Sequence, residues 1–236
     1  MKQIILFGLL SLILCVPAFG QKAAEVKPSC SLGINQSPEL RGFRMGMTQA
    51  AVLARLPGVT IAKPDKFGLA RLRVSTIDSS LLIKPSSRER SVQQDITVGP
   101  DAGSAFVVDA GMFPALKGVR KLEMRFIDGR LSYLQVTYDD SVKWDSIEQF
   151  VETVATTLKL PQDWKTPAES DGSQEKELRC EGFVLSANTG NTRDINSGPE
   201  LILQDLAAWK AMSKKQNDIV EKSKREEEEK RKAFKP

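Results

Sequence analysis

Apolar and polar residues alternate in two runs that meet at Asp128-Gly129, within the stretch KLEMRFIDGRLSYLQVTYD. Alternation with a period of two is typical of a half-buried strand, and an Asp-Gly pair favours the positive φ angles of a tight turn. The pattern therefore predicts a β-hairpin. A two-residue turn sets Phe126 opposite Leu131, whereas a longer loop sets Met124 opposite Leu134, and the sequence leaves both registers open.

Alternation predicts further strands on both sides of this hairpin. Residues 68–76 place three apolar side chains on one face and Arg71, Arg73 and Ser75 on the other, which indicates a half-buried strand with a basic outer face. Short strands are also predicted at 81–83 and 105–108, with an exposed loop at 85–101 between them. Residues 178–187 and 199–205 read as two more strands, joined by a long loop.

Helical patterns occur at three places. Thr48 is a suitable N-cap for a short amphipathic helix that Pro57-Gly58 would end. Asp145 and Glu148 have the spacing of a capping box, and an apolar stripe from Ile147 to Leu158 predicts the main helix behind them. From Leu206 onward the chain is helical and increasingly charged.

Strands and helices are segregated along the chain rather than strictly alternating. This order favours the α+β class, with an antiparallel sheet packed by two main helices and a charged C-terminal helix. The helix-then-strands pattern occurs twice, which suggests a tandem repeat. We expect four parts: a signal peptide at 1–20, an extended lead-in at 21–40, an α+β globular domain at 41–206 and a charged helical tail at 207–236.

The N-terminus has the pattern of an export signal. An apolar run from Ile4 to Val16 is followed by Ala18-Phe19-Gly20, the small-x-small pattern that signal peptidase cuts, so cleavage is expected between Gly20 and Gln21. A periplasmic or secreted location follows. No later run approaches the roughly 20 apolar residues of a transmembrane helix, so no span is expected in the mature chain. Lipidation at Cys15 remains an alternative, although Leu14 precedes it where a small residue is usual.

Two cysteines, Cys30 and Cys180, remain after such cleavage. An oxidising compartment favours one disulfide between them, and two separately buried thiols are the alternative. The chain has 34 Lys and Arg residues against 30 Asp and Glu residues, a formal net charge of +4. These charges interleave in sign, so nucleic-acid binding is not expected.

The chain has no histidine. Serine and cysteine triads that use histidine are thereby excluded, as are zinc sites with histidine ligands. Ser173 and Lys176 have the spacing of a serine-lysine nucleophile, but they fall in a polar stretch, and the adjacent carboxylates Asp139-Asp140 would point to opposite sides of a strand. We therefore expect no catalytic residue, no cofactor-binding residue, no metal site and no enzyme activity.

The stretch GFRMGMTQAAVLARLPG, residues 42–58, resembles the helix-start signature of the SmpA/OmlA/BamE superfamily through Gly46-Met47-Thr48, the apolar helix and the closing Gly58. Ala51 stands where that family usually has Glu. Related helix-then-strands units occur in the tandem domains of β-lactamase inhibitor protein. A later set of residues, from Phe113-Pro114 to Tyr138-Asp139, resembles uncharacterised exported bacterial proteins with the same helix start. The resemblance implies a small exported domain that works by protein-protein contact at the cell envelope.

Our leading hypothesis from the sequence is a non-enzymatic exported envelope protein that binds another envelope or secreted protein. One alternative is a small-ligand binder or an enzyme that uses a carboxylate cluster or the Arg71 and Arg73 face. A second alternative is an inhibitor of a secreted hydrolase, with the loop from Ser86 to Asp101 as its projecting element.

Overall fold

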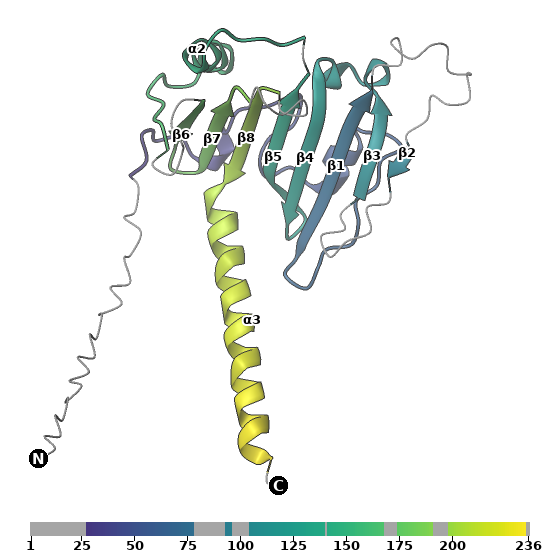
Figure 1. The fold of residues 1–236 in the computed structure, drawn as a ribbon, viewed down its shortest axis with the longest axis vertical. Coiled ribbons are helices and arrows are strands. Elements are labelled where there is room, and N and C mark those ends of the chain that lie inside the picture. Colours follow the sequence, from purple (N-terminus) through teal and green to yellow (C-terminus); the bar gives the residue numbers. More distant parts are fainter. Residues whose placement is uncertain are drawn as a thin grey trace, which may run out of the picture.

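A single mixed sheet dominates the fold (Figure 1). The computed structural model describes residues 27–77, 93–95, 104–139, 141–167, 174–190 and 198–234. Within them, eight strands form one sheet in the order β2-β3-β1-β4-β5-β8-β7-β6. The strands are β1 Leu69–Ile77, β2 Gln93–Asp95, β3 Ser104–Asp109, β4 Val119–Ile127, β5 Arg130–Tyr138, β6 Glu175–Arg179, β7 Phe183–Asn188 and β8 Glu200–Asp205.

Neighbouring strands are antiparallel at every pairing of this sheet except the parallel pair β1 and β3. The helices are α1 Gln49–Leu53, α2 Ile147–Leu158 and α3 Leu206–Ala233, with short 3-10 turns η1 Ile34–Gln36, η2 Ala110–Met112 and η3 Pro114–Leu116. The α+β class is thus confirmed, and the expectation of a wholly antiparallel sheet is wrong at one pair. The helices within the described ranges are too short or too polar to cross a membrane.

The starts of α1 and α2, for which the sequence predicted capping residues, both exist, and the cap of α2 is shifted by one residue. The Thr48 hydroxyl accepts a hydrogen bond from the Ala51 amide at 3.2 Å, as an N-cap does. The cap of α2 is Ser146 and not Asp145, because the Ser146 hydroxyl accepts from the Gln149 amide and the Gln149 side chain accepts from the Asp145 amide. The cap is therefore one residue later than predicted, and the reciprocal capping box does not form, because Gln149 accepts from the amide of Asp145 and not from that of the cap residue Ser146.

One face of the sheet carries the main hydrophobic core. Alternate side chains of seven adjacent strands, from β3 to β6, point to this face, and Val52 of α1 and Phe150 of α2 belong to the same buried cluster. The strand residues in it include Leu72 and Val74 of β1, Leu122 and Met124 of β4, Leu134 and Val136 of β5, Leu201 and Leu203 of β8, Leu185 and Ala187 of β7, and Leu178 of β6. The period-two pattern thus determines which side chains leave water.

The β4–β5 hairpin combines both registers that the sequence left open. Ile127 pairs with Arg130 across Asp128-Gly129, both at positive φ, and Phe126 pairs with Leu131. The register then shifts by one residue, so that Met124 pairs with Leu134. Leu131 and Leu134 are three positions apart and both fully buried, which regular alternation does not allow. A bulge at Ser132 solves this conflict.

The predicted single strand at 178–187 is wrong. Residues 175–188 form two strands, β6 and β7, which pair with each other after a tight turn at 180–182. Gly182 in this turn allows the N-terminal arm to approach closely, because a Cβ there would overlap the backbone of Gly33 and Ile34. The sheet therefore gains one strand, and β6 begins inside the stretch that the sequence indicated to be a polar loop.

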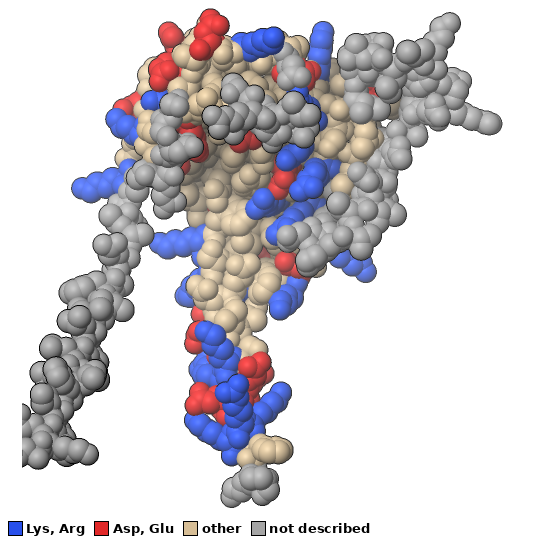
Figure 2. All heavy atoms as spheres, viewed as in Figure 1, with Lys and Arg blue, Asp and Glu red and all other residues tan. Residues whose placement is uncertain are grey.

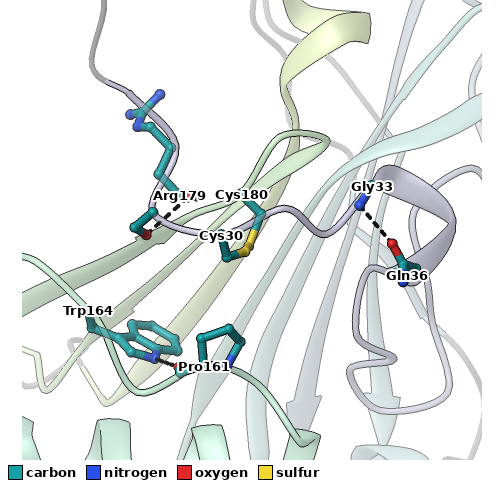
Figure 3. The surroundings of a disulfide bond; sticks show 8 residues. Cys30, Gly33, Gln36, Pro161, Trp164, Arg179 and Cys180 are labelled. Atoms are coloured by element: carbon teal, nitrogen blue, oxygen red, sulfur yellow. Dashed lines mark hydrogen bonds between the residues drawn. A yellow bond between two sulfur atoms is a disulfide. The ribbon is translucent and has the colours of Figure 1, made fainter.

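The N-terminal arm lies against this turn (Figure 3). A disulfide joins Cys30 to Cys180, as predicted, with 4.5 Å between their Cα atoms. Backbone hydrogen bonds on both sides of it run from Ser29 to Arg179 and from Gly182 to Leu32. The later part of the predicted lead-in is thus attached to the sheet, whereas Cys15 and the predicted Gly20-Gln21 cleavage site lie outside the described residues.

The Gly46-Met47-Thr48 segment pairs with the start of β5. The Leu131 amide donates to the Met47 carbonyl, and the Gly46 amide donates to the Leu131 carbonyl, both at 2.8 Å. β8 pairs with β5 only from Tyr133 onward, so this segment occupies the edge of β5 that β8 leaves open. The helix-start stretch therefore positions α1 beside the hairpin turn.

Helix α3 continues directly from β8 and extends away from the sheet (Figure 1). Its first turns pack on the hairpin end, where Met212 joins Leu69 and Ile127 in a second buried cluster. The Trp209 indole donates to the carbonyl of Ser132, the bulge residue, at 3.0 Å. The bulge thus supplies the acceptor that anchors the helix.

Candidate functional site

The candidate site is the sheet face opposite the main core, which we call the open face. Because side chains alternate along a strand, the residues that lie between the core residues of each strand point to this face. The strand registers align these residues in rows across the sheet. These residues are Arg71, Arg73 and Ser75 of β1, Lys121, Glu123 and Arg125 of β4, Tyr133, Gln135 and Thr137 of β5, Glu200, Ile202 and Gln204 of β8, Val184, Ser186 and Asn188 of β7, and Glu175, Glu177 and Arg179 of β6. Of the described elements, α3 borders this face, through Trp209.

Glu123 lies at the centre of a group of cations on the open face. Its carboxylate accepts hydrogen bonds from Nε and Nη2 of Arg125 at 3.1 and 2.8 Å. Arg73 Nη2 lies 3.6 Å and Lys121 Nζ 3.8 Å from the second carboxylate oxygen. The Glu123 side chain is 10% exposed and that of Arg73 is 50% exposed. The carboxylate is therefore enclosed by cations, one of which is presented to solvent.

The charges around Glu123 determine its ionisation. Burial by itself raises the pKa of this carboxyl, but the Arg125 hydrogen bond and the charges of Arg125, Lys121 and Arg73 outweigh it. The pKa of Glu123 is consequently lowered from the ordinary 4.5. At neutral pH the group is an ionised partner for cations and a poor proton acceptor.

Arg125 is held by aromatic rings as well as by Glu123. Its guanidinium carbon lies 4.5 Å from the Tyr133 ring centroid and 5.8 Å from that of Trp209. The two rings themselves meet edge to face, with centroids 6.2 Å apart. A planar guanidinium stacked in this way loses little further side-chain entropy on binding. The bulge, the hairpin and α3 thus combine to build a rigid Arg-Tyr-Trp group.

A chain of polar side chains leads from this group across β5 to β8. The Tyr133 hydroxyl donates to Gln135 at 3.0 Å, and the Gln135 amide donates to Glu200 at 2.7 Å. The pKa of Tyr133 is raised to about 12, mainly because the phenol is buried. The charge of Arg125 opposes this shift, and the charges of Glu123 and Glu200 add to it. Tyr133 is therefore a neutral hydrogen-bond donor at physiological pH.

The open face is asymmetric in charge. Figure 2 shows Lys and Arg side chains gathered over β4 and β1, next to an uncharged surface around the lower end of β8 and the upper part of α3. At the far edge, on β6, Arg179 pairs with Glu177 at 2.9 Å. Four of the six outward positions at 71–75 and 121–125 are cationic and one is acidic. The arrangement suits recognition of a surface that is acidic beside an uncharged region.

The sequence located part of this site. Arg71 and Arg73 lie on the open face as the basic outer face of β1, but Glu123, Arg125, Tyr133 and Trp209 were not identified as site residues. The alternation on β4 and β5 indicates that Glu123, Arg125 and Tyr133 point away from the core. Only the register of the two strands brings Arg125 beside Tyr133. Trp209 comes from a helix whose path the strand pattern does not specify.

The weaker chemical motifs lie elsewhere. Lys176 is on β6, where its ammonium group lies 3.1 Å from the Thr166 hydroxyl and 3.5 Å from Glu148. Asp139 accepts from the Ser141 amide after the end of β5. Ser173, Asp140 and the predicted loop from Ser86 to Asp101 lie outside the described residues, apart from the backbone of β2. Acidic and cysteine residues in the described ranges form no group of three that could hold a metal ion.

The lowered pKa of Glu123 predicts that the free energy of unfolding depends on pH. Because its pKa is lower in the folded state, its contribution is complete above the unfolded value of 4.5 and is lost as pH falls below that value. Glu123→Gln lacks the titrating group, so it should lose less free energy of unfolding than wild type between pH 7 and pH 3. Urea unfolding at both pH values measures this. Exposed Glu181→Gln is the control, and equal losses for wild type and Glu123→Gln contradict the assignment.

Comparisons with known proteins give no relative to guide the interpretation: no family model, no curated protein and no solved structure matches the chain.

Proposed function

We propose that this chain is a non-enzymatic, exported protein that binds another envelope or secreted protein through its open face. The observation that carries the proposal is the rigid Arg125-Tyr133-Trp209 group beside the cations of β1 and β4. Arginine, tyrosine and tryptophan dominate the binding energy of protein interfaces, because they bury a large area at low entropic cost.

The charge of the face supports a partner with an acidic surface. Arg73 and Lys121 are 50% and 35% exposed, and both lie near the Glu123 carboxylate, which they share with Arg125. An acidic partner surface would meet these cations, while the uncharged area at the lower end of β8 and the upper part of α3 supplies contact area. Charge complementarity of this kind mainly increases the association rate and the specificity.

Location outside the cytoplasm is part of the proposal. The disulfide between Cys30 and Cys180 supports it, since such bonds persist in oxidising compartments. The predicted signal sequence before Gln21 points to the same compartment, the periplasm or the exterior.

Kinship with the SmpA/OmlA/BamE superfamily, and a tandem repeat, also remain proposals. In each half of the sheet, a helix comes first in the chain and an antiparallel group of strands comes after it. Helix α1 precedes β1, β4 and β5, and helix α2 precedes β6, β7 and β8. The last strands of the halves, β5 and β8, meet in the middle. A duplication with two helices packed on one face accounts for this arrangement.

The two alternatives from the sequence receive less support. A ligand or enzyme site around Arg71 and Arg73 requires a concave pocket. The cavity beside α2 and the one beside η2 and η3 contain neither residue. The hydrolase-inhibitor alternative depends on a loop outside the described residues.

Charge reversal at one exposed residue tests the proposal. Wild type, Arg73→Glu and Arg44→Glu would be immobilised and exposed to envelope extract from the host, with captured proteins identified by mass spectrometry. We expect a specific protein to be captured by wild type and by Arg44→Glu, which alters an exposed residue that belongs to no strand of the open face, and to be lost with Arg73→Glu. The reason is repulsion of the acidic surface by the new carboxylate.

The captured protein is then purified and its affinity measured directly. Arg73→Glu should weaken binding at least about tenfold, as expected for loss and reversal of one interface charge. A chain ending at Gln216 retains Trp209, Met212 and Lys215, which hold α3 on the hairpin, and tests the projecting helix separately. Equal affinity of wild type and Arg73→Glu would reject the open face as the interface.

A further inference from the structure

A concave site lies on the core side of the sheet, away from the open face. It is a cavity of about 350 Å³ between α2, the end of β5 and the segment at 39–41. Its lining residues are Glu39, Leu40, Arg41, Tyr138, Val142, Trp144, Phe150, Thr153, Val154, Thr157, Leu158 and Leu201. Its volume is within the range of about 300–1,000 Å³ that small-molecule sites occupy.

The walls of this cavity are mainly apolar and aromatic. Trp144 stacks on Phe150 with ring centroids 5.1 Å apart, and Tyr138 meets Phe150 edge to face at 6.4 Å. Val154 and Leu158 continue the same side of α2. Such walls suit an aliphatic chain, because its methylene groups are stabilised by removal from water.

One cation is positioned at the cavity by unusual backbone geometry. Arg41 has φ +55°, and with Gly42 at φ +85° it forms a tight turn between Leu40 and Phe43. Asn, Asp and Gly are the usual residues at such positions, so arginine is unexpected there. The turn places the guanidinium 5.0 Å from the Tyr138 ring centroid. Its charge is thus held beside the apolar walls.

Trp144 offers the face of its ring to the cavity rather than a hydrogen bond. Its indole nitrogen is buried, with less than 1 Å² of accessible surface, and has no acceptor in the described part of the chain. A ligand in the cavity would therefore contact the apolar ring. Glu39 also lines the cavity, but it is exposed, so solvent screens its repulsion of an anion.

We infer that this cavity binds an amphipathic carboxylate, with the carboxylate at Arg41 and the aliphatic chain along Trp144, Phe150, Val154 and Leu158. The cation complements the carboxylate, and the apolar walls complement the aliphatic chain. This site is separate from the open face, and the inference does not depend on the proposed partner binding.

Isothermal titration of the protein with sodium decanoate and with 1-decanol tests the inference. We expect saturable one-site binding of decanoate. Arg41→Asn suits the turn and removes the charge, so it should weaken decanoate binding about tenfold, the value of one charge-assisted hydrogen bond, and leave decanol binding unchanged. Glu39→Gln, which removes the opposite charge beside the same cavity, should not weaken decanoate binding.

Two neighbouring substitutions on α2 test the location. Thr157→Phe fills the cavity from an exposed helix position and should abolish binding of both probes, whereas Thr156→Phe, also exposed but outside the cavity, should not. Absence of saturable decanoate binding to wild type overturns the inference. So does an equal effect of Arg41→Asn on the two probes, or an equal effect of Thr156→Phe and Thr157→Phe. Capture of a protein partner by the open face is unaffected by any of these outcomes.

Discussion

Replacing Phe126 by alanine should destabilise the protein by about 3–5 kcal/mol, the usual cost of removing a buried phenylalanine. Phe126 is fully buried and lies on β4, opposite Leu131 and next to the bulge that sets the hairpin register. Its loss would leave a cavity between two central strands. Urea unfolding monitored by circular dichroism measures the change.

The matched control is Arg73→Ala, which alters the opposite face of the adjacent strand. A half-exposed surface residue of this kind should change the free energy of unfolding by no more than about 0.5 kcal/mol. A cost below about 1 kcal/mol for Phe126→Ala would mean that the core is not packed around this ring.

Removing the disulfide should have the second large effect. The bond joins residues 150 positions apart, so it restricts the unfolded chain strongly. We expect Cys30→Ala/Cys180→Ala to lower the free energy of unfolding by about 2–5 kcal/mol, with the chain-entropy model giving the upper end. The double variant avoids a lone thiol, and denaturant unfolding of both proteins measures the difference.

Ser29→Ala separates the covalent bond from the local hydrogen bonds of the arm. It removes the hydroxyl that donates to the Arg179 carbonyl at 3.1 Å and leaves the disulfide intact. Its expected cost is about 1 kcal/mol. If the cysteine double variant loses no more than Ser29→Ala, the N-terminal arm is held by its hydrogen bonds and packing, and the disulfide adds little.

Local pattern was sufficient to predict the α+β class, the Asp128-Gly129 hairpin, β1 with its basic outer face and the start of α1. Each of these depends on neighbours in the chain: alternation selects the buried face, and Thr48 or the Asp-Gly pair supplies local backbone geometry. The pairing of Cys30 with Cys180 was also predictable, because the expected removal of Cys15 with a signal sequence would leave each of these thiols one available partner.

Features that join distant segments were not predictable in this way. Whether Ser132 forms a bulge depends on Leu131 and Leu134 both entering one core, and the position of the N-terminal arm depends on its close approach to Gly182 in the turn at 180–182. The parallel pairing of β1 with β3 likewise joins separate parts of the chain. The cluster around Arg125 and the cavity at Arg41 each draw residues from three or more segments. Their chemistry exists only after packing has selected one register and one helix path, since residue spacing along a chain does not encode which faces meet.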